Sequence, residues 1–383
     1  MYRHTTCRVC GGVFHPTPLL EFADSPESAQ GFRDSPGGGA GVVDLRIHQC
    51  RYCGLVQHDL PPVSYFRDVV RAVAFSEEMG RFRKGQLCEW IMRHGLQDRR
   101  ILELGCGKGE YLDLLQAAGA RQVFGIEYSQ DNLQVAQRRG LQARHGYMAP
   151  GFENPWREPF GAFAIFSFME HWPDLGGSLQ ALHGMLSDQA CGLVEVPNFE
   201  FVVGQGLYSE FTPDHIFYFD RDTLRAVLER NGFEVVAIDA VWHDYILSAQ
   251  VKKRAPRQSD FFLSRQRKLV EQLNSFVGRF QPQEVVIWGA GHQALAVISI
   301  ARLRGKVAHV VDSAPFKQNR YTPGSDLLIK APESLLEDAP QALVIMAAAY
   351  SDEVARTVAA RYPRIEHVAI LREDKLEEIQ HAR

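Results

Sequence analysis

The sequence is predicted to fold as an α/β protein in which two parallel-sheet domains follow a small N-terminal module. Three observations predict this class. Short apolar runs alternate with helix-length amphipathic stretches over residues 69–255, and the alternation starts again at residue 256. A glycine-rich turn follows an apolar run in each of these segments. Residues 1–68 are instead rich in turns and carry two Cys-x-x-Cys pairs, so we expect three domains, at 1–68, 69–255 and 256–383.

The composition excludes several functional classes. With 45% hydrophobic and 23% charged residues, the 383-residue chain can bury large cores and is not expected to be disordered. A net charge of −4 without a dense basic surface argues against a nucleic-acid partner. The chain has no run of about 18 apolar residues that would predict a membrane span, and its first residues form no apolar signal core. We therefore expect a cytoplasmic protein with reduced thiols and a small-molecule partner; the oligomeric state is left open, with a monomer among the options.

Four cysteines in the N-terminal segment predict a metal site. Cys7 and Cys10 form one Cys-x-x-Cys pair, Cys50 and Cys53 form the other, and a glycine follows each pair. Four thiolates in two such pairs suit a structural, tetrahedral Zn²⁺ site, which would also stabilise a module with little apolar mass. An inserted loop at Phe32–Gly41 accounts for the long separation between the pairs. An iron–sulfur centre and metal-free thiols are the alternatives.

The middle segment is expected to form a mostly parallel sheet with helices on both faces. The predicted helices are Phe75–His94, Gly109–Ala118, Asp131–Arg139, Gly177–Leu186 and Thr223–Asn231. The predicted strands are Arg100–Leu104, Gln122–Glu127, Ala162–Phe168, Cys191–Val196, Glu234–Ala240 and Tyr245–Lys252. A short basic run, Lys252-Lys253-Arg254, then marks a solvated linker.

A glycine-rich turn follows the first of these strands. Glu103 lies at the end of the strand, and Gly105, Gly107 and Gly109 recur at every second position around Cys106 before a helix begins. Glycines let the backbone turn sharply and approach a ligand, and the amides at the start of a helix face a carboxylate well. We expect Glu103 to accept from an ammonium group of the ligand. The turn is therefore predicted to bind a nucleoside that carries an amino-acid moiety.

A second acid adds to this pattern. Glu127 ends the next predicted strand, where a carboxylate can accept from both hydroxyls of a ribose. Dinucleotide-binding folds use the same device, but their turn reads Gly-x-Gly-x-x-Gly, whereas this one reads Glu-x-Gly-x-Gly-x-Gly. The latter resembles class I methyltransferases over residues 69–255. The resemblance implies that the turn, together with Glu103 and Glu127, binds S-adenosylmethionine.

The segment at the end of the predicted strand Ala162–Phe168 reads Phe168-Met169-Glu170-His171. In the class I methyltransferases this segment lines the donor cleft near the sulfonium, so the resemblance implies that Glu170 contacts the cofactor. The alternative is that Glu170 caps a helix and His171 is solvated.

A second glycine-rich turn occurs near the C-terminus. Gly289–Ala294 fits Gly-x-Gly-x-x-Ala after a strand at Glu284–Trp288, and Asp312 follows the next strand, Ala308–Val311. We also expect a helix at Asp260–Phe280, a helix through Ala301 and a strand at Ala342–Ala347. Few strands are predicted after Asp312, which argues against a complete dinucleotide crevice. The turn is therefore expected to hold a nucleotide phosphate or to pack, with an NAD site as the alternative.

The order of the three segments resembles the three-domain sugar C-methyltransferases, which act on nucleotide-linked ketosugars. The most distinctive match is Lys317-Gln318-Asn319 followed by Thr322-Pro323-Gly324, and Ala348–Glu353 also fits. The resemblance implies an N-terminal zinc module, a methyl-donor domain and a Rossmann-like C-terminal domain. It also implies that Lys317 and Asn319 contact the substrate.

The catalytic segment of that family has a Glu-His pair, which Asp214 and His215 match here with a shorter acid. A proton on carbon beside a ketone needs a base, and the imidazole of His215 is expected to be that base, oriented by Asp214. Tyr65, Tyr218 or His171 is expected to donate to the enolate oxygen.

Asn198 follows the strand at Cys191–Val196 and is expected to contact the acceptor or the donor, with a turn residue as the alternative. Thr212 stands where the family has a tyrosine, and only Trp242–Tyr245 represents a later His-Gly-Gly-Ser-like stretch. These departures leave O- or N-methylation of a nucleotide sugar open. An NAD-dependent sugar oxidoreductase and a scaffold with an inactive methyltransferase domain are the alternatives from other classes.

Overall fold

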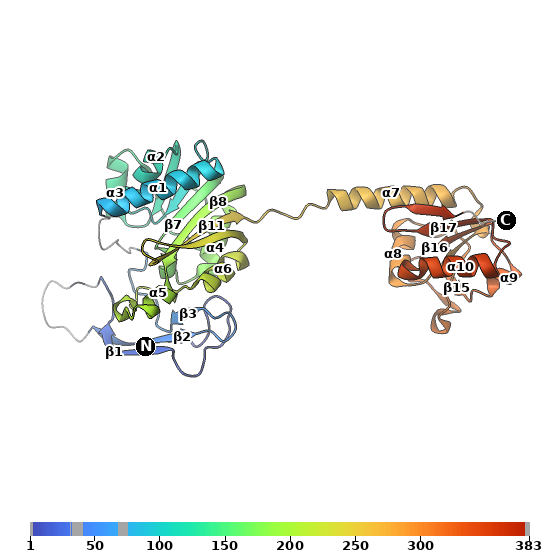
Figure 1. The fold of residues 1–383 in the computed structure, drawn as a ribbon, viewed down its shortest axis with the longest axis horizontal. Helices are drawn as coiled ribbons and strands as arrows, with labels where there is room; N and C mark the ends of the chain where they lie inside the picture. Colours follow the sequence, from blue (N-terminus) through green and yellow to red (C-terminus); the bar gives the residue numbers. More distant parts are fainter. Residues whose placement is uncertain (1–2, 31, 33–40, 68–75, 380–383) are drawn as a thin grey trace. The chain divides into compact units, whose positions relative to one another are not determined.

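A computed structural model describes residues 3–30, 32, 41–67 and 76–379. The chain divides into two compact units, Met1–Pro256 and Arg257–Arg383, drawn in Figure 1. The predicted α/β class is confirmed. The predicted domain boundary after residue 68, the start of the first helix at Phe75 and most of the loop at Phe32–Gly41 lie outside the described residues and stay predictions. Among the described residues, no helix is both long and apolar enough to cross a membrane.

The first unit is built on a seven-stranded sheet in the order β10-β11-β8-β7-β4-β5-β6. The strands are β4 (Arg100–Leu104), β5 (Gln122–Glu127), β6 (Gln142–His145), β7 (Phe160–Phe166), β8 (Leu186–Pro197), β10 (Phe233–Val241) and β11 (Ile246–Lys253). Neighbours from β8 to β6 pair in parallel, and the antiparallel strands β10 and β11 close one edge. Because the central strands are parallel, their carboxyl ends meet at one edge of the sheet.

Helices cover both faces of this sheet. They are α1 (Glu77–His94), α2 (Glu110–Ala117), α3 (Gln130–Arg138), α4 (Leu175–Gly184), α5 (Phe199–Gly204) and α6 (Arg221–Arg230), with single turns η1 (Met169–His171) and η2 (Tyr208–Glu210). One apolar core takes side chains from α1, α2 and α3, and the other takes them from α4 and α6. Ser76 caps the first helix and Gly95, with a φ of 60°, ends it.

Several predicted element boundaries in this unit are wrong, and the largest difference is at β8, which begins at Leu186 and not at Cys191. The strand predicted at Ala162–Phe168 ends at Phe166, because Ser167 takes a positive φ of 45° and the chain enters η1. The helix predicted at Gly177–Leu186 spans Leu175–Gly184, because the Asp174 side chain caps its start by accepting from the amide of Gly177.

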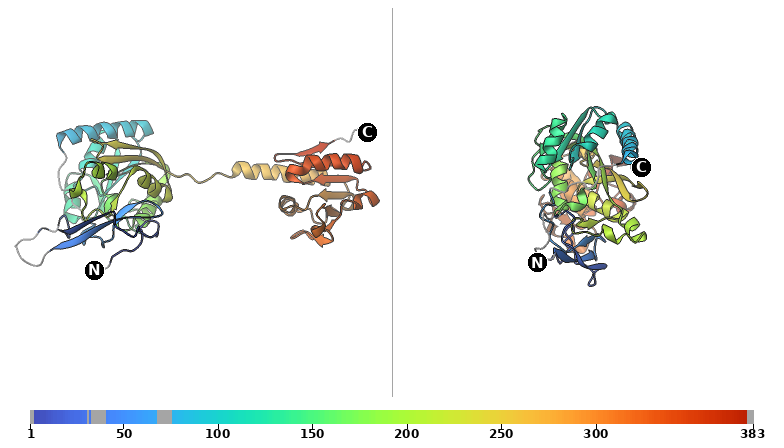
Figure 2. Two further views of the ribbon diagram at one scale, coloured as in Figure 1. Left: turned by 60° about the horizontal axis from the view of Figure 1, so that its bottom comes forward. Right: turned by 90° about the vertical axis from the view of Figure 1, so that its left-hand side faces the viewer.

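A second, four-stranded sheet contains the N-terminal module. Its order is β1 (Leu20–Pro26), β2 (Val42–Gln49), β3 (Val56–His58) and β9 (Phe217–Tyr218), all antiparallel. The fourth strand comes from the far side of the sequence and follows the predicted catalytic segment. Figure 2 shows the blue N-terminal strands against the green part of the chain in both views. The N-terminal module and the domain after it therefore share a sheet.

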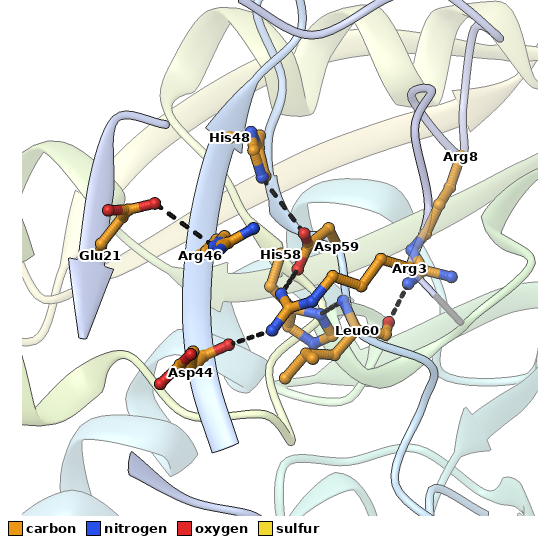
Figure 3. Close-up of polar contacts among 9 residues, drawn as sticks. All are labelled: Arg3, Arg8, Glu21, Asp44, Arg46, His48, His58, Asp59 and Leu60. Carbon is orange, nitrogen blue, oxygen red and sulfur yellow. Dashed lines mark hydrogen bonds and ion pairs between the residues drawn. The ribbon is translucent and has the colours of Figure 1, made fainter. Parts of the chain in front are cut away.

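Polar contacts attach the first residues of the chain to this sheet (Figure 3). The Arg3 guanidinium donates to the Asp59 carboxylate at 2.5 Å and to the carbonyl of Asp44 at 2.8 Å. His48 lies 3.4 Å from the other oxygen of Asp59, and Arg8 donates to the carbonyl of Leu60. The hydrogen bonds of Asp59 to Arg3 and His48 keep the pKa of its carboxyl below the ordinary value although burial opposes this shift.

The second unit contains another seven-stranded sheet, in the order β14-β15-β13-β12-β16-β17-β18. The strands are β12 (Val285–Trp288), β13 (His309–Val311), β14 (Arg320–Tyr321), β15 (Leu328–Lys330), β16 (Ala342–Ile345), β17 (His367–Leu371) and β18 (Leu376–Ile379). The helices are α7 (Asp260–Val277), α8 (His292–Ile300), α9 (Ser334–Glu337) and α10 (Ser351–Arg361), with single turns η3 (Pro282–Glu284), η4 (Pro315–Lys317) and η5 (Ala348–Tyr350). The expectation of few strands after Asp312 is wrong, since all of β14 to β18 follow it.

Candidate active site

The first glycine-rich turn adopts a backbone that other residues rarely take. Gly105, Gly107 and Gly109 have φ angles of 69°, 57° and 91°. A Cβ on Gly105 would lie 2.7 Å from the Phe168 ring, which is closer than real Cβ atoms approach. The amides of Gly105 and Cys106 both donate to the carbonyl of Ile126, at 2.9 and 3.1 Å. The turn is therefore folded tightly against the next strand, as the glycine spacing predicts.

Glu127 lies at the end of β5 beside this turn. One oxygen of its carboxylate accepts from the amide of Gly107 at 2.7 Å, and the other accepts from the amide of Ser129 at 2.8 Å. Only 6% of the residue is exposed, yet it contributes to a cavity wall. The geometry thus places an acid where the sequence predicts a ribose acceptor.

Three other residues of the predicted cofactor set lie within the fold. Glu103 is buried at the end of β4. Cys106 packs so closely that a Cβ on Gly125 would lie 2.5 Å from its Sγ, and burial raises the pKa of its thiol. A Cβ on Gly109 would lie 2.2 Å from Leu141. The structure thus gives Cys106 and Gly109 a packing role, whatever contact they make with a ligand.

A cavity of about 520 Å³ opens at the carboxyl ends of β4, β5 and β7. This is within the roughly 300–1,000 Å³ usual for small-molecule sites. Gly105, Gly107 and Glu127 line one side of it, and Glu170, His171, Asp214 and His215 line the other. The turn and the predicted catalytic segment, which are about a hundred residues apart in the chain, therefore face the same space.

Glu170, His171 and His215 form a cluster in the cavity wall. Their donor atoms lie within 4.8 Å of one another, and the two imidazole rings stand 4.9 Å apart. Nδ1 of His171 lies 2.7 Å from the carbonyl of Asp214. Burial raises the pKa of Glu170 to about 8. Burial, together with the neighbouring His171 and His58, lowers the pKa of His215 to about 3.

The expectation that Asp214 orients His215 is not supported by the contacts. The Asp214 carboxylate accepts from the Tyr65 hydroxyl at 2.6 Å and from the amide of Ala29 at 2.7 Å. The Tyr65 oxygen also accepts from the amide of Gln30 at 2.9 Å. Since side chains of adjacent residues diverge, Asp214 turns toward the N-terminal module while His215 faces the cavity. Asp214 therefore holds Tyr65, which is not among the residues that line the cavity in the described part of the chain.

Two predicted contact residues lie away from the cavity. The Tyr218 hydroxyl donates to the carbonyl of Thr212 and accepts from its amide, both at 3.2 Å, so its hydrogen-bonding capacity serves the backbone. Asn198 caps the start of α5, and its side-chain amide donates to the carbonyl of Asp244 at 2.8 Å. Neither residue is among those that line the cavity in the described part of the chain. The turn alternative for Asn198 fits this geometry.

The four predicted metal ligands converge. The sulfur atoms of Cys7, Cys10, Cys50 and Cys53 lie within 4.8 Å of one another, with Cys7 and Cys53 at 3.7 Å. A tetrahedral site with Zn–S bonds of about 2.3 Å needs sulfurs about 3.8 Å apart. Backbone amides point at two thiols, from Gly12 to Cys10 at 3.3 Å and from Tyr52 to Cys50 at 3.4 Å. The donor set and its spacing fit Zn²⁺.

Comparisons with known proteins identify the reaction class. Residues 79–238 match a family described as methyltransferase domain, and residues 254–364 match one described as C-methyltransferase C-terminal domain. C-methyltransferase NovU of Streptomyces niveus is 22% identical over 386 residues, which cover 91% of this chain and 90% of that protein. The chain is an S-adenosylmethionine-dependent methyltransferase.

Further relatives match the methyltransferase over shorter stretches. A probable S-adenosylmethionine-dependent methyltransferase of Mycolicibacterium smegmatis is 30% identical over 173 residues, which cover 44% of this chain and 65% of that protein. Among solved structures, magnesium protoporphyrin IX methyltransferase of Synechocystis PCC 6803 aligns with a TM-score of 0.39 and 15% identity over 50% of this chain and 97% of that one.

In the second unit of the methyltransferase, the predicted substrate residues serve the fold. Lys317 donates to the Asp312 carboxylate at 2.9 Å. The same carboxylate accepts from the amides of Ala290 and Ala314 at 2.8 and 2.9 Å. Asn319 takes a positive φ of 58° and bonds to β15 through its amide. The second turn is therefore closed by an acid that accepts from two backbone amides and one lysine of the chain itself.

A buried ion pair beside the cavity was not predicted from the sequence. Arg83 and Glu195 are 1% and 0% exposed, and they pair directly. Gln86 donates to Glu195 at 2.6 Å, which links α1 to the end of β8. The signal was present: Arg83 shares a helix face with Leu87 and Trp90, so a charge stands in an apolar stripe. A charge at such a position needs a buried partner.

Proposed function

We propose that the methyltransferase transfers the methyl group to a carbon atom of a nucleotide-linked ketosugar. The observation that carries this proposal is the shared cavity, in which the donor turn faces the wall that holds His215. A relative named as a C-methyltransferase, alignable over 91% of the chain, supports carbon as the acceptor atom. The ketosugar rests on the resemblance of the Lys317–Gly324 segment to the sugar C-methyltransferases.

The donor side of the cavity fits S-adenosylmethionine, which supplies an electrophilic methyl group when bound. Gly105 and Gly107 have positive φ angles and no side chain, so a ligand can approach the backbone of the turn closely. Glu127 would accept from the ribose hydroxyls in exchange for one of its bonds to backbone amides.

On the acceptor side, we assign His215 to the step that removes the proton from carbon. It is only partly buried, and it lines the cavity beside His171. With a pKa of about 3, its imidazole is neutral at pH 7 but is a weak base. Proton removal from carbon therefore needs a strong stabilisation of the enolate, and the group that provides it must lie in the same wall.

We also propose that Cys7, Cys10, Cys50 and Cys53 bind a structural Zn²⁺. Its effect reaches the active site through β9, which pairs with β3 of the N-terminal module. His58 reinforces the contact, because its Nε2 donates to the carbonyl of Pro213 at 3.0 Å while its Nδ1 accepts from the amide of Leu60 at 3.1 Å. The zinc would therefore fix the segment that carries Asp214 and His215.

The test is a screen of nucleotide-linked sugars with a labelled methyl donor. We expect label to enter a ketosugar in wild type and in His15→Ala, whose side chain is exposed, and to be absent in His215→Ala. In heavy water, deuterium should enter the carbon beside the ketone when S-adenosylhomocysteine replaces the donor. Retention of the substrate hydrogen in the methylated product would reject the carbon route in favour of O- or N-methylation.

Calorimetry separates this function from the oxidoreductase alternative. We expect heat of binding for S-adenosylhomocysteine and none for NAD⁺ or NADH. Binding of NADH alone would overturn the proposed function.

A further inference from the structure

We propose that Glu170, His171 and His215 bind one divalent transition-metal cation in the cavity, where it coordinates the oxygen of the acceptor. The chemistry of this site rests on the proposed function, but the binding of the cation does not. One carboxylate and two imidazoles present donor atoms within 4.8 Å of one another. A small closing movement of the side chains would bring all three donor atoms to about 2.0–2.2 Å from a common ion.

The first independent observation is the Glu170 carboxylate. Only 1% of the residue is exposed, and neither of its side-chain oxygens has a hydrogen-bond partner in the described structure. An isolated buried carboxylate is costly, and a native protein rarely retains one without a partner. The carboxylate lines the cavity next to two imidazoles. A cation between these groups would provide the missing partner.

The second observation is the tautomer of His171. Its Nδ1 lies 2.7 Å from the carbonyl of Asp214, which can only accept, so Nδ1 carries the hydrogen. Nε2 is then left with a lone pair. A histidine that donates one ring N–H to a backbone carbonyl and offers the other nitrogen is the usual arrangement of a metal-binding histidine.

The support for this histidine extends into the N-terminal module. The backbone of Asp214 accepts from His171, and its carboxylate accepts from Tyr65 at 2.6 Å and Ala29 at 2.7 Å. His171 is thus held by a residue whose carboxylate is itself held at two points. Groups behind a metal ligand act in this way when they fix its orientation.

The donor set narrows the choice of ion. Two imidazoles and one carboxylate suit Zn²⁺, Fe²⁺, Co²⁺ or Mn²⁺ better than Mg²⁺ or Ca²⁺, which prefer oxygen ligands. Three protein ligands leave at least one position open, as at catalytic metal sites, whereas four cysteines form a closed one. The two sites in this chain are therefore distinguishable by ligand chemistry.

A cation here would provide the enolate stabilisation that the cavity wall needs. It would polarise the ketone oxygen and lower the pKa of a bound water toward neutrality. The C–H bond would then break with its proton passing to the bound hydroxide, and its electron pair would form the C=C bond of an enolate whose oxygen rests on the cation. His215 serves this step as a ligand of the cation.

The test measures binding of Mn²⁺ alone, by electron paramagnetic resonance, to protein that holds one equivalent of zinc per chain, which the four thiolates retain. Mn²⁺ is the weakest competitor in the divalent series and does not displace Zn²⁺ from thiolates. We expect one Mn²⁺ per chain in wild type and in His15→Ala, with affinity lowered at least about 100-fold in Glu170→Gln and in His215→Ala. Equal binding by wild type and both variants, or none by wild type, would overturn the proposal.

Cobalt gives a readout that needs no variant. With zinc retained on the cysteines, Co²⁺ added to wild type should give the weak absorption bands of nitrogen and oxygen ligands, without thiolate charge transfer. Thiolate bands alone would overturn the proposal. This measurement decides the question if Glu170→Gln or His215→Ala does not fold.

Activity then separates the cation from the proposed function. Removal of the cation with a chelator, at unchanged zinc content, should lower methyl transfer at least about 100-fold, and Mn²⁺ should restore it. A chelated enzyme that methylates a ketosugar at the full rate would overturn the cation and leave the function standing. An enzyme that binds the cation but methylates no ketosugar would overturn the proposed function and leave the cation site standing.

Discussion

The two glycine-rich turns of this chain have the same local design and different outcomes. In each, an acid at the end of the next strand accepts from an amide of the turn: Glu127 from Gly107 at 2.7 Å, and Asp312 from Ala290 at 2.8 Å. Glu127 lines a cavity of about 520 Å³. Asp312 instead pairs with Lys317 at 2.9 Å. The motif therefore sets the backbone of both turns, whereas residues outside the motif set the surroundings of the two acids.

The glycines of the two turns also differ in their surroundings. Gly105 and Gly107 both have positive φ and face the cavity. Gly289 has a φ of 122°, and a Cβ there would lie 2.5 Å from the carbonyl of Met346, so this glycine serves close contact with the backbone next to β16. Gly291 has no atom within 4 Å of an added Cβ. Two glycines of the first turn therefore line a cavity, whereas the first glycine of the second turn packs against the backbone.

The largest expected effect comes from placing a side chain in each turn. Gly105→Ala adds a Cβ at 2.7 Å from Phe168 and puts alanine at a φ of 69°. The turn must shift to relieve strain and clash of about 3 kcal/mol, and the shifted turn should bind S-adenosylhomocysteine more than about 100-fold more weakly. Gly291→Ala is the matched control and should bind as wild type does. Calorimetry and thermal unfolding measure both, and equal affinities would remove the functional difference between the turns.

Truncating the two acids is the next test. Glu127→Ala should lower affinity for S-adenosylhomocysteine about 10- to 100-fold, because charge-assisted bonds contribute about 1.5–3 kcal/mol. Asp312→Ala should leave this affinity unchanged and lower the free energy of unfolding of the second unit by about 1–3 kcal/mol, since Ala290 and Ala314 lose their acceptor. Calorimetry and denaturant unfolding separate the two results. A loss of ligand affinity in Asp312→Ala would contradict the assignment of the second turn to packing.

The first turn also differs in the wall that the N-terminal module adds to its cavity. Cys50→Ser should abolish zinc binding and lower methyl transfer at least about tenfold, because β9 loses its support and His215 shifts from its working position. Binding of S-adenosylhomocysteine should be retained, since the turn lies on β4 and β5. Cys88→Ser, which changes a cysteine outside the cluster, is the control. Zinc analysis and a methyl-transfer assay measure the outcome; full activity without zinc would disconnect the module from catalysis.

These features differ in how far the sequence predicts them. The donor turn and the four cysteines are short-range patterns, because glycine spacing and Cys-x-x-Cys pairs fix geometry within a few residues. The pairing of β9 with β3 joins residues about 160 apart, and such pairing leaves no periodicity to read. The sequence could therefore predict residues of the cavity wall, but it could not predict which other residues they contact.

Asp214 shows the same limit at a single residue. Its identity suggested a partner for the adjacent His215, yet its carboxylate bonds to Tyr65, which lies 149 positions away. In the second unit, β14 and β15 were too short for a pattern, with two and three residues. The strand β17 and the helix α10 were long enough to be predicted but were missed. Arg83 is the exception, since a charge in an apolar helix stripe was a readable signal of a buried pair.

The smallest expected effect concerns the ion pair that closes the second turn. Burial opposes the ionised form of Asp312, but the amides of Ala314 and Ala290 and the ammonium of Lys317 together lower its pKa below the ordinary value. A carboxyl with a lowered folded-state pKa stabilises the fold above its unfolded pKa of about 3.9 and loses that contribution as pH falls through the folded value. The second unit should therefore lose stability as the solution is acidified below about pH 4. The Lys317→Met variant should lose less stability over the same interval, because the folded-state pKa of its Asp312 lies closer to the unfolded value.

Hydrogen exchange of the β12 and β13 amides measures this loss of stability in both proteins, with Lys306→Met as the control for loss of a lysine at an exposed site. An identical pH dependence in wild type and Lys317→Met would mean that the backbone amides alone close the turn, so that the difference between the two turns would lie in their glycines rather than in the lysine.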